Sequence, residues 1–292
     1  MKQEYIELVK KNKHLQKELF VCPDKNPFEC TLELLNELQK AIKSKKPFSM
    51  IRLGDGEGRI LGYPDVFEDK IYINQVLTYQ FGAGAVNELK ELYGEQYLKK
   101  GLSVLRSFIS EACNNADIIG APSWLHFRAA INTDNIIPQV AQTLCLKFVS
   151  EITPKKEVIF DHFIFKPFHK EGYFKILLAG INLVTVVSHT DISKKIEFSF
   201  NITHCKYVRV PGHNSFMHSD ELHYPLEYKN VVKKLGAENT GDVFLVAAGY
   251  LGKYYCDYIK KSGGIAIDIG SIFDGWCGTG RTDSIQNKSH LL

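Results

Sequence analysis

The sequence predicts an α/β protein whose mostly parallel sheet carries helices on both faces. Several short runs are apolar throughout instead of alternating with polar residues, as in parallel strands that are covered on both sides. In the carboxyl-terminal half, these runs are followed by small or polar turns, and helical segments fill the intervals. The 292 residues are 45% hydrophobic, which is enough to bury a sizeable core.

The first twenty residues predict an amphipathic helix, because apolar residues recur at helical spacing among Lys and Glu: Ile6, Val9, Leu15 and Leu19. This helix either docks on the body of the protein or on a second subunit, or lies against an anionic membrane surface. Docking is favoured, because the apolar face lacks the large side chains typical of membrane insertion. With a second helix over residues 30–45, it forms an amino-terminal helical extension, residues 1–45.

The main domain is expected over residues 46–282, followed by a loose tail over 283–292. Its predicted strands are the apolar runs 48–53, 117–121, 157–165, 183–188, 206–210, 242–248 and 264–269. Its predicted helices cover 85–113, with a break near Gly101, and then 134–150, 222–235 and 251–261.

Charge and cysteine usage narrow the class of protein. A formal charge of +3 is far from the concentrated positive field of a dedicated nucleic-acid binder, so we expect no nucleic-acid partner. The 7 cysteines are scattered without a Cys-x-x-Cys pair, which indicates reduced thiols. The amino terminus has no apolar signal core, and the apolar stretch 176–187 is too short to cross a bilayer. These features predict a cytoplasmic protein.

Two acids lie on a glycine-punctuated segment directly after the first predicted strand. Asp55 and Glu57 would lie at the carboxyl end of that strand, where ligands bind in open α/β sheets. Hard oxygen ligands suit Mg²⁺ or Mn²⁺, so the pair is a candidate metal site. Gly54 permits unusual backbone angles and close ligand approach, while Arg52 could neutralise a phosphate. The alternative is a polar turn that leads into a helix near residues 58–61. As acids on a loop, both are expected to be exposed and to contribute little to stability.

A second group of candidate residues follows the last two predicted strands. Residues 246–253 read as strand, small-residue turn and helix start, so Gly249, Tyr250 and Lys253 could hold a diphosphate. Gly249 could instead serve only tight packing of the helix on the strand. Asp268 could bind a ribose or sugar hydroxyl, and Ser271 could cap the next turn. The alternative is that Asp268 caps a helix and that the nearby Trp276 belongs to the core.

Histidines 204, 213, 218 and 223 crowd one region, but their spacing matches no zinc pattern. His213 and Asn214 are instead expected to line a loop at a strand end.

Residues 51–57 (Ile-Arg-Leu-Gly-Asp-Gly-Glu), the turn 247–252 and residues 264–276 together resemble the bacterial GT-D-fold glycosyltransferases, formerly catalogued as a domain of unknown function. The resemblance covers roughly residues 45–280. It implies a Rossmann-like sheet and a hexosyltransferase-like enzyme. The donor would be a nucleotide sugar, UDP-linked, and the metal motif would fall on Asp55 and Glu57 with Mn²⁺ or Mg²⁺. The acceptor would be a glycan, glycolipid or glycoprotein in surface polysaccharide or glycoprotein biosynthesis.

The roles that fit this resemblance are specific. A metal on the two acids would neutralise charge on the leaving diphosphate, and Arg52 or Lys253 would share that task. If the reaction inverts configuration it needs a general base, for which Asp274 and His213 are the candidates. Peripheral contact with the inner face of the membrane, through the acceptor or the amino-terminal helix, and a homo-oligomer stay open.

Two other classes of function remain as alternatives. A strand that ends in Asp268-Ile269-Gly270 also suits an S-adenosylmethionine-dependent methyltransferase. The order of the motifs along the chain argues against that class. Its glycine-rich cofactor turn normally lies early in the Rossmann domain, where this chain has a doubly acidic segment. The remaining alternative is a nucleotide-binding module without catalysis. The intact acid pair weighs against it.

Overall fold

The computed structural model describes residues 2–21, 26, 29–67, 91, 94–124, 136–152, 159–212 and 223–278. The predictions for His213, Asn214 and the tail 283–292 lie outside these residues.

The core of the fold is a seven-stranded, all-parallel sheet with the strand order β3-β2-β1-β7-β6-β4-β5. The strands are β1 (Phe48–Arg52), β2 (Ile118–Ala121), β3 (Ile159–Asp161), β4 (Leu183–Ser188), β5 (His204–Arg209), β6 (Val243–Val246) and β7 (Ile265–Asp268). Each lies within or beside an apolar run that predicted it. The α/β class with a parallel sheet is therefore confirmed.

Two hydrophobic clusters, one on each face of the sheet, explain why the strands are apolar throughout. Successive side chains of a strand point to opposite faces, so Ile51 belongs to the first cluster and its neighbour Met50 to the second. Both side chains are fully buried. A strand with two covered faces has no position left for an exposed polar residue, as in β2, β6 and β7, whose residues are all buried. β5, at the edge of the sheet, is the exception, because its terminal residues His204 and Arg209 are exposed.

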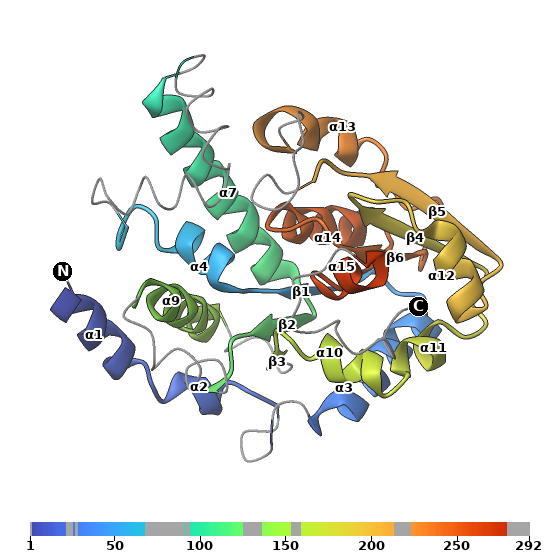
Figure 1. The fold of residues 1–292 in the computed structure, drawn as a ribbon, viewed down its shortest axis with the longest axis horizontal. Helices are drawn as coiled ribbons and strands as arrows, with labels where there is room; N and C mark the ends of the chain where they lie inside the picture. The colour runs from blue at the N-terminus through green and yellow to red at the C-terminus, as the bar shows by residue number, and fades with distance from the viewer. Residues whose placement is uncertain are drawn as a thin grey trace.

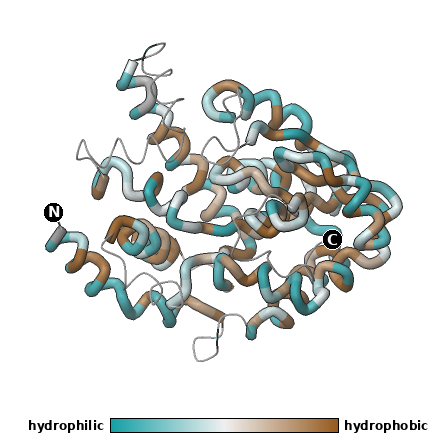
Figure 2. The backbone as a smooth tube through the Cα atoms, viewed as in Figure 1, coloured by the Kyte–Doolittle hydropathy of each residue, from teal (hydrophilic) through white to brown (hydrophobic). Residues whose placement is uncertain are grey.

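Helices form the outer layers of the molecule (Figure 1). The helices that pack into the first cluster are α1 (Lys2–Lys11), α2 (Leu15–Glu18), α4 (Asp55–Leu61), α7 (Glu95–Asn115), α9 (Ile137–Ile152), α13 (Tyr228–Val232) and α14 (Leu251–Lys261). Those that pack into the second are α3 (Thr31–Ser44), α10 (Phe165–Lys170), α11 (Tyr173–Leu178), α12 (Ser193–Phe200) and α15 (Ile272–Cys277). Hydrophobic and hydrophilic residues are interspersed along these helices, as Figure 2 shows.

The amino-terminal segment packs on the body of the protein. Tyr5, Leu15 and Phe20 are buried in the first cluster, and the Tyr5 hydroxyl donates a 3.2 Å hydrogen bond to the Val66 carbonyl. This confirms the docked alternative, although the segment forms two helices, α1 and α2, instead of one. Within the described parts of the chain, no helix combines the length and apolarity needed to cross a membrane.

Several element predictions were wrong in detail. α7 runs through Gly101 without a break. β3 ends at Asp161, and the predicted end of that strand instead enters α10. The helix expected over residues 222–235 is interrupted, because Tyr224 has a non-helical backbone, with φ of −117° and ψ of 135°, and α13 covers only Tyr228–Val232. The short helices α10, α11, α12 and α15 were not predicted, because few residues set their periodicity.

The topology changes direction between β1 and β7, in the middle of the sheet. From β1 the chain builds outward through β2 and β3, and the second half of the chain forms the other side and returns to place β7 beside β1. Ligands in open α/β sheets bind outside the carboxyl ends of the strands at such a switch point. The carboxyl ends of β1 and β7 are Arg52 and Asp268, two of the predicted site residues.

The close approach of α4 to α9 gives a test of this packing. A Cβ added to Gly58 would lie 1.9 Å from the Ala141 carbonyl oxygen, a distance that backbone atoms cannot accommodate without moving the helix. We expect Gly58→Ala to destabilise the protein by about 1–3 kcal/mol, the usual cost of overpacking. Chemical denaturation measures the change.

Gly236→Ala is the matched control, because no atom lies within 4 Å of its added Cβ. Its effect should stay within about 0.5 kcal/mol. Equal stability of the two variants would mean that α4 and α9 are not packed this closely.

Candidate functional site

Arg52 ends β1 and is held by β7 and by the turn after β3. Its Nε donates to the Asp268 carbonyl at 2.9 Å and its Nη1 donates to the His162 carbonyl at 2.6 Å. The backbone N–H of Arg52 donates to Asp268 Oδ2 at 3.2 Å, and Nη2 lies 3.5 Å from Asp268 Oδ1. The guanidinium is therefore fixed across the three strands β7, β1 and β3.

Gly270 provides the room for this guanidinium. A Cβ at that position would lie 1.3 Å from Arg52 Nη2, and the backbone there has a φ of +50°. Both facts require glycine, because other residues resist positive φ and any side chain would collide with Arg52. The Asp268-Ile269-Gly270 segment thus serves as the wall of an arginine pocket.

The acidic motif begins a helix and does not form an open loop. α4 starts at Asp55, with Gly54 as its N-cap residue. Gly54 has an ordinary extended backbone, with φ of −116°, so the expectation that it provides unusual angles was wrong. Its N–H donates to Glu57 Oε2 at 2.8 Å, and its carbonyl accepts from the Cys145 thiol at 3.1 Å. Both backbone groups of Gly54 therefore have partners within the protein.

Glu57 is buried, which contradicts the expectation of an exposed loop acid. Its relative exposure is 8%. One carboxylate oxygen accepts the Gly54 N–H and the other lies 2.7 Å from the Lys253 ammonium. A glutamate at the third helical position commonly reaches back in this way to the N-cap backbone. The side chain is therefore part of the helix cap and of a buried ion pair.

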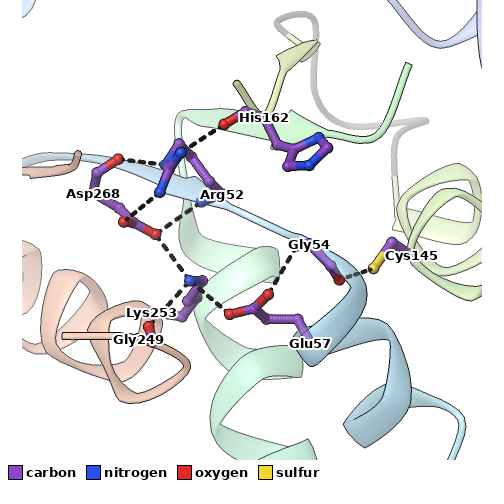
Figure 3. A network of polar contacts seen from close by, with 8 residues as sticks. All are labelled: Arg52, Gly54, Glu57, Cys145, His162, Gly249, Lys253 and Asp268. Carbon is purple, nitrogen blue, oxygen red and sulfur yellow. Dashed lines mark hydrogen bonds and ion pairs between the residues drawn. The ribbon is translucent and has the colours of Figure 1, made fainter. Parts of the chain in front are cut away.

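Lys253 lies at the centre of the network that Figure 3 shows. Its Nζ is 2.7 Å from Glu57 Oε1, 3.1 Å from Asp268 Oδ2 and 3.1 Å from the Gly249 carbonyl oxygen. An ammonium has three N–H donors, so these oxygens match its capacity. Lys253 comes from α14, Glu57 from α4 and Asp268 from β7, which brings residues far apart in the sequence to one point.

Arg52, Glu57, Lys253 and Asp268 balance one another, with two cations and two carboxylates. Burial alone would raise the pKa of Glu57, but the Lys253 ammonium and the Gly54 N–H outweigh it and hold the pKa below the ordinary value. Burial would likewise lower the pKa of Lys253, but Asp268 and Glu57 outweigh it and raise the pKa. Glu57 and Lys253 are thus both charged at neutral pH.

The side chain of Asp55 points away from that of Glu57 and lies in a more exposed environment. Side chains two positions apart on a helix diverge by about 200°. Asp55 Oδ2 lies 3.6 Å from Arg59 Nη2, and the Asp55 side chain is 38% exposed. The two acids of the motif therefore do not face a common point when both belong to α4.

The residues present do not fit a divalent metal held jointly by Asp55 and Glu57. Glu57 uses both oxygens for the helix cap and for Lys253, and a second cation beside that ammonium would be repelled. Among the residues that the structure describes, no group of three or more His, Cys, Asp or Glu side chains is placed to hold a metal ion.

The remaining predicted residues lie beside this network. Tyr250 precedes α14, packs on the first cluster and has a pKa raised by burial. Ser271 is exposed and makes no side-chain cap for α15, so its predicted capping role was wrong. Asp274 lies in the first turn of that helix, and Trp276 is fully buried in the core, as its alternative reading predicted. Asp268 binds Arg52 and Lys253 and does not cap a helix.

Two residues of the site were not predicted from the sequence. The His162 carbonyl accepts from Arg52, and the Cys145 thiol donates to Gly54. Burial, followed by the nearby Glu57 carboxylate, raises the pKa of Cys145 well above its ordinary value, so this thiol stays protonated. Both contacts involve backbone carbonyls, which leave no signal in a side-chain pattern.

A model of the GT-D fold-like domain family matches residues 30–276 of the chain. The chain belongs to this family. The resemblance read from residues 51–57, 247–252 and 264–276 is thereby confirmed, and with it the prediction of a GT-D-type glycosyltransferase at the level of the class. The match covers the whole sheet and the four residues of the ion network.

Two solved structures have a similar arrangement. One is a selenomethionine-substituted structure of domain of unknown function 1792, with a TM-score of 0.48, 17% identity, and coverage of 91% of this chain and 94% of that chain. The other is described as showing that domain of unknown function 1792 has a distinct glycosyltransferase fold; its TM-score is 0.47, its identity 18%, and its coverage 91% and 95%. No curated protein matches the chain.

The two acids of the motif should differ in their effect on stability. Glu57→Ala leaves the Lys253 ammonium short of a partner in a buried site, so we expect a loss of about 3–5 kcal/mol. Asp55→Ala removes a partly exposed pair and should cost about 1 kcal/mol or less. Urea denaturation of both variants measures the difference, and equal losses would contradict the buried position of Glu57.

The lowered pKa of Glu57 predicts a pH dependence. A carboxyl whose pKa is lower in the folded state stabilises that state above its unfolded pKa, and the stabilisation disappears as the pH falls through the folded value. Wild type should therefore exceed Glu57→Gln in unfolding free energy at neutral pH, and the gap should narrow below the ordinary pKa of 4.5. Denaturation of both proteins across this range is the measurement. A gap independent of pH would mean that ionised Glu57 is not the stabilising species.

Proposed function

We propose that the protein is a glycosyltransferase that moves a sugar from a nucleotide-sugar donor, UDP-linked, to a glycan, glycolipid or glycoprotein acceptor. The reaction would belong to surface polysaccharide or glycoprotein biosynthesis. Membership in the GT-D fold-like family carries the proposal. It argues against the methyltransferase alternative.

The position of the ion network supports the proposal. Arg52 and Lys253 lie at the carboxyl edge of the sheet, beside the switch point between β1 and β7. Transfer of a sugar from a nucleotide leaves a diphosphate, and fixed positive groups stabilise the charge that develops on it. Because the guanidinium and the ammonium are already oriented by hydrogen bonds, they would need little rearrangement when that charge appears.

The amino end of α14 supports a diphosphate site beside these cations. Gly249 takes a φ of +57° and starts the turn from β6 into the helix. The first turn of a helix has backbone N–H groups without partners inside the helix, and they favour anions. The formal charge of the ion network is balanced, so we assign the attraction for a diphosphate to this helix end together with the oriented cations.

The finer parts of the proposal follow the resemblance. We propose on this basis that transfer depends on Mn²⁺ or Mg²⁺ and that the nucleotide is UDP. The general base would be Asp274 or His213, and the protein would contact the membrane peripherally. A ribose hydroxyl would bind Asp268. The Asp268 carboxylate is 2% exposed and already accepts from Arg52 and Lys253, so the hydroxyl would have to share these bonds.

Ligand-dependent stabilisation tests the donor class. Purified protein would be melted with UDP, other nucleoside diphosphates, their sugar conjugates and S-adenosylmethionine, each with Mn²⁺ and with a chelator. A ligand that prefers the native state raises the Tm. We expect stabilisation by a nucleotide sugar and its diphosphate. Stabilisation by S-adenosylmethionine alone would overturn the proposal, and a non-catalytic module would bind the nucleotide without turning over its sugar.

Arg52→Lys is the sharper variant for this assay. Lysine keeps the charge but cannot reproduce the forked bonds to Asp268 and His162. We expect the Kd of Arg52→Lys for the nucleotide to rise at least about tenfold, because lysine loses the charge-assisted hydrogen bonds that orient the positive charge. Lys206→Arg, on the surface of β5, is the control, since its partner Glu238 is also exposed. Its Kd should match that of wild type.

A further inference from the structure

The Lys253 ammonium lies in a cradle of three oxygens that has the composition of a metal site. The oxygens come from Glu57, Asp268 and the Gly249 carbonyl, at 2.7, 3.1 and 3.1 Å from Nζ. Carboxylates and backbone carbonyls are the ligands that Mg²⁺, Mn²⁺ and Ca²⁺ prefer. The cradle is also buried, since Glu57 is 8% and Asp268 2% exposed. Two such carboxylates need a cation between them.

Lys253 cannot easily leave this cradle. Its side chain is 5% exposed, and it begins one helical turn after Gly249, whose carbonyl it also binds. The residue lies on α14, which packs on both β7 and β1, so its backbone is fixed relative to Asp268. Removing the ammonium would leave two buried carboxylates that repel each other, a costly arrangement.

We propose that Lys253 is the resident cation of the acidic motif. Its ammonium takes the place that a divalent metal would occupy between Glu57 and Asp268, and Glu57 is its counter-ion and not a metal ligand. Asp55 is then the one acid of the motif that a metal arriving with a ligand can contact, because it faces away from the cradle and is 38% exposed.

The consequence for transfer rests on the proposed function. If the site binds a nucleotide sugar, the Lys253 ammonium is the positive charge nearest the acidic motif. A divalent ion would then enter the site only when it is bound to the donor. The occupancy of the cradle is independent of that reaction, so it can be tested on ligand-free protein.

The first arm of the test uses wild type without nucleotide. Mn²⁺ is titrated into wild type and Glu57→Gln, with bound metal read by electron paramagnetic resonance and stability by melting. The expected result is that Glu57→Gln leaves Mn²⁺ binding unchanged, because Glu57 holds no metal. A Mn²⁺ site in wild type that is lost in Glu57→Gln would overturn the proposal, whatever the nucleotide assay shows.

The second arm removes the ammonium. Lys253→Ala should gain a Mn²⁺ site in the cradle, and at about 100 times its Kd the metal should raise the Tm by about 5 °C. The double variant Lys253→Ala/Glu57→Gln should lose that gain. Lys260→Ala is the control on the same helix, because that lysine binds Asp117 and the Asn115 carbonyl outside the cradle. Its Mn²⁺ response should equal that of wild type.

The outcomes separate the two proposals. If Lys253→Ala folds only with Mn²⁺, the metal has replaced the ammonium and the proposal holds. If it melts at the same temperature with and without Mn²⁺, the cradle is not a cation site and the proposal fails. Neither result depends on whether any nucleotide binds. If the protein binds no nucleotide but gives the expected result in both arms, the proposed function is contradicted and the proposal for Lys253 is supported.

Discussion

The buried ion network around Lys253 is the interaction on which the centre of the structure depends. It joins α4, which follows the first strand, to β7 and α14, which come from the last part of the main domain. Arg52 extends it to the turn after β3 through the His162 carbonyl. Charges this deeply buried are tolerated only when every partner is in place. The network therefore connects the two halves of the sheet at the point where β1 pairs with β7.

The balance of the network explains its position. Parallel strands end with their carbonyl groups at one edge, and the strand interiors on both sides of β1 are apolar and cannot accept a charge. The carboxyl edge is the first place where polar side chains can meet. Desolvation acts against every member, yet each charge offsets another: the pKa of Glu57 is lowered and that of Lys253 is raised despite burial. The same arrangement that stabilises the fold thus also keeps cations oriented at the switch point.

Much of the fold could be predicted, because its signals are local. Apolar runs bounded by small residues marked all seven strands, and the positions of Arg52 and Asp268 at strand ends followed directly. The partners of those residues could not be predicted. Whether Lys253 meets Glu57 or an external phosphate depends on how α14 packs against β1 and β7, and no sequence period encodes that contact. The backbone acceptors at His162 and Gly249 were invisible for the same reason.

The acidic motif shows why a short pattern does not determine a site. Asp-x-Glu on an extended segment would place both carboxylates on one face, since side chains two apart in a strand point the same way. On the first turn of α4 the same residues diverge, and their electrostatic environments diverge with them. Glu57 turns inward to the helix cap and to a buried ammonium, while Asp55 is partly exposed and pairs with Arg59. The helix begins at Asp55, shortly after the strand ends at Arg52, so the helix start, and not the identity of the two acids, decides which of them can reach a ligand.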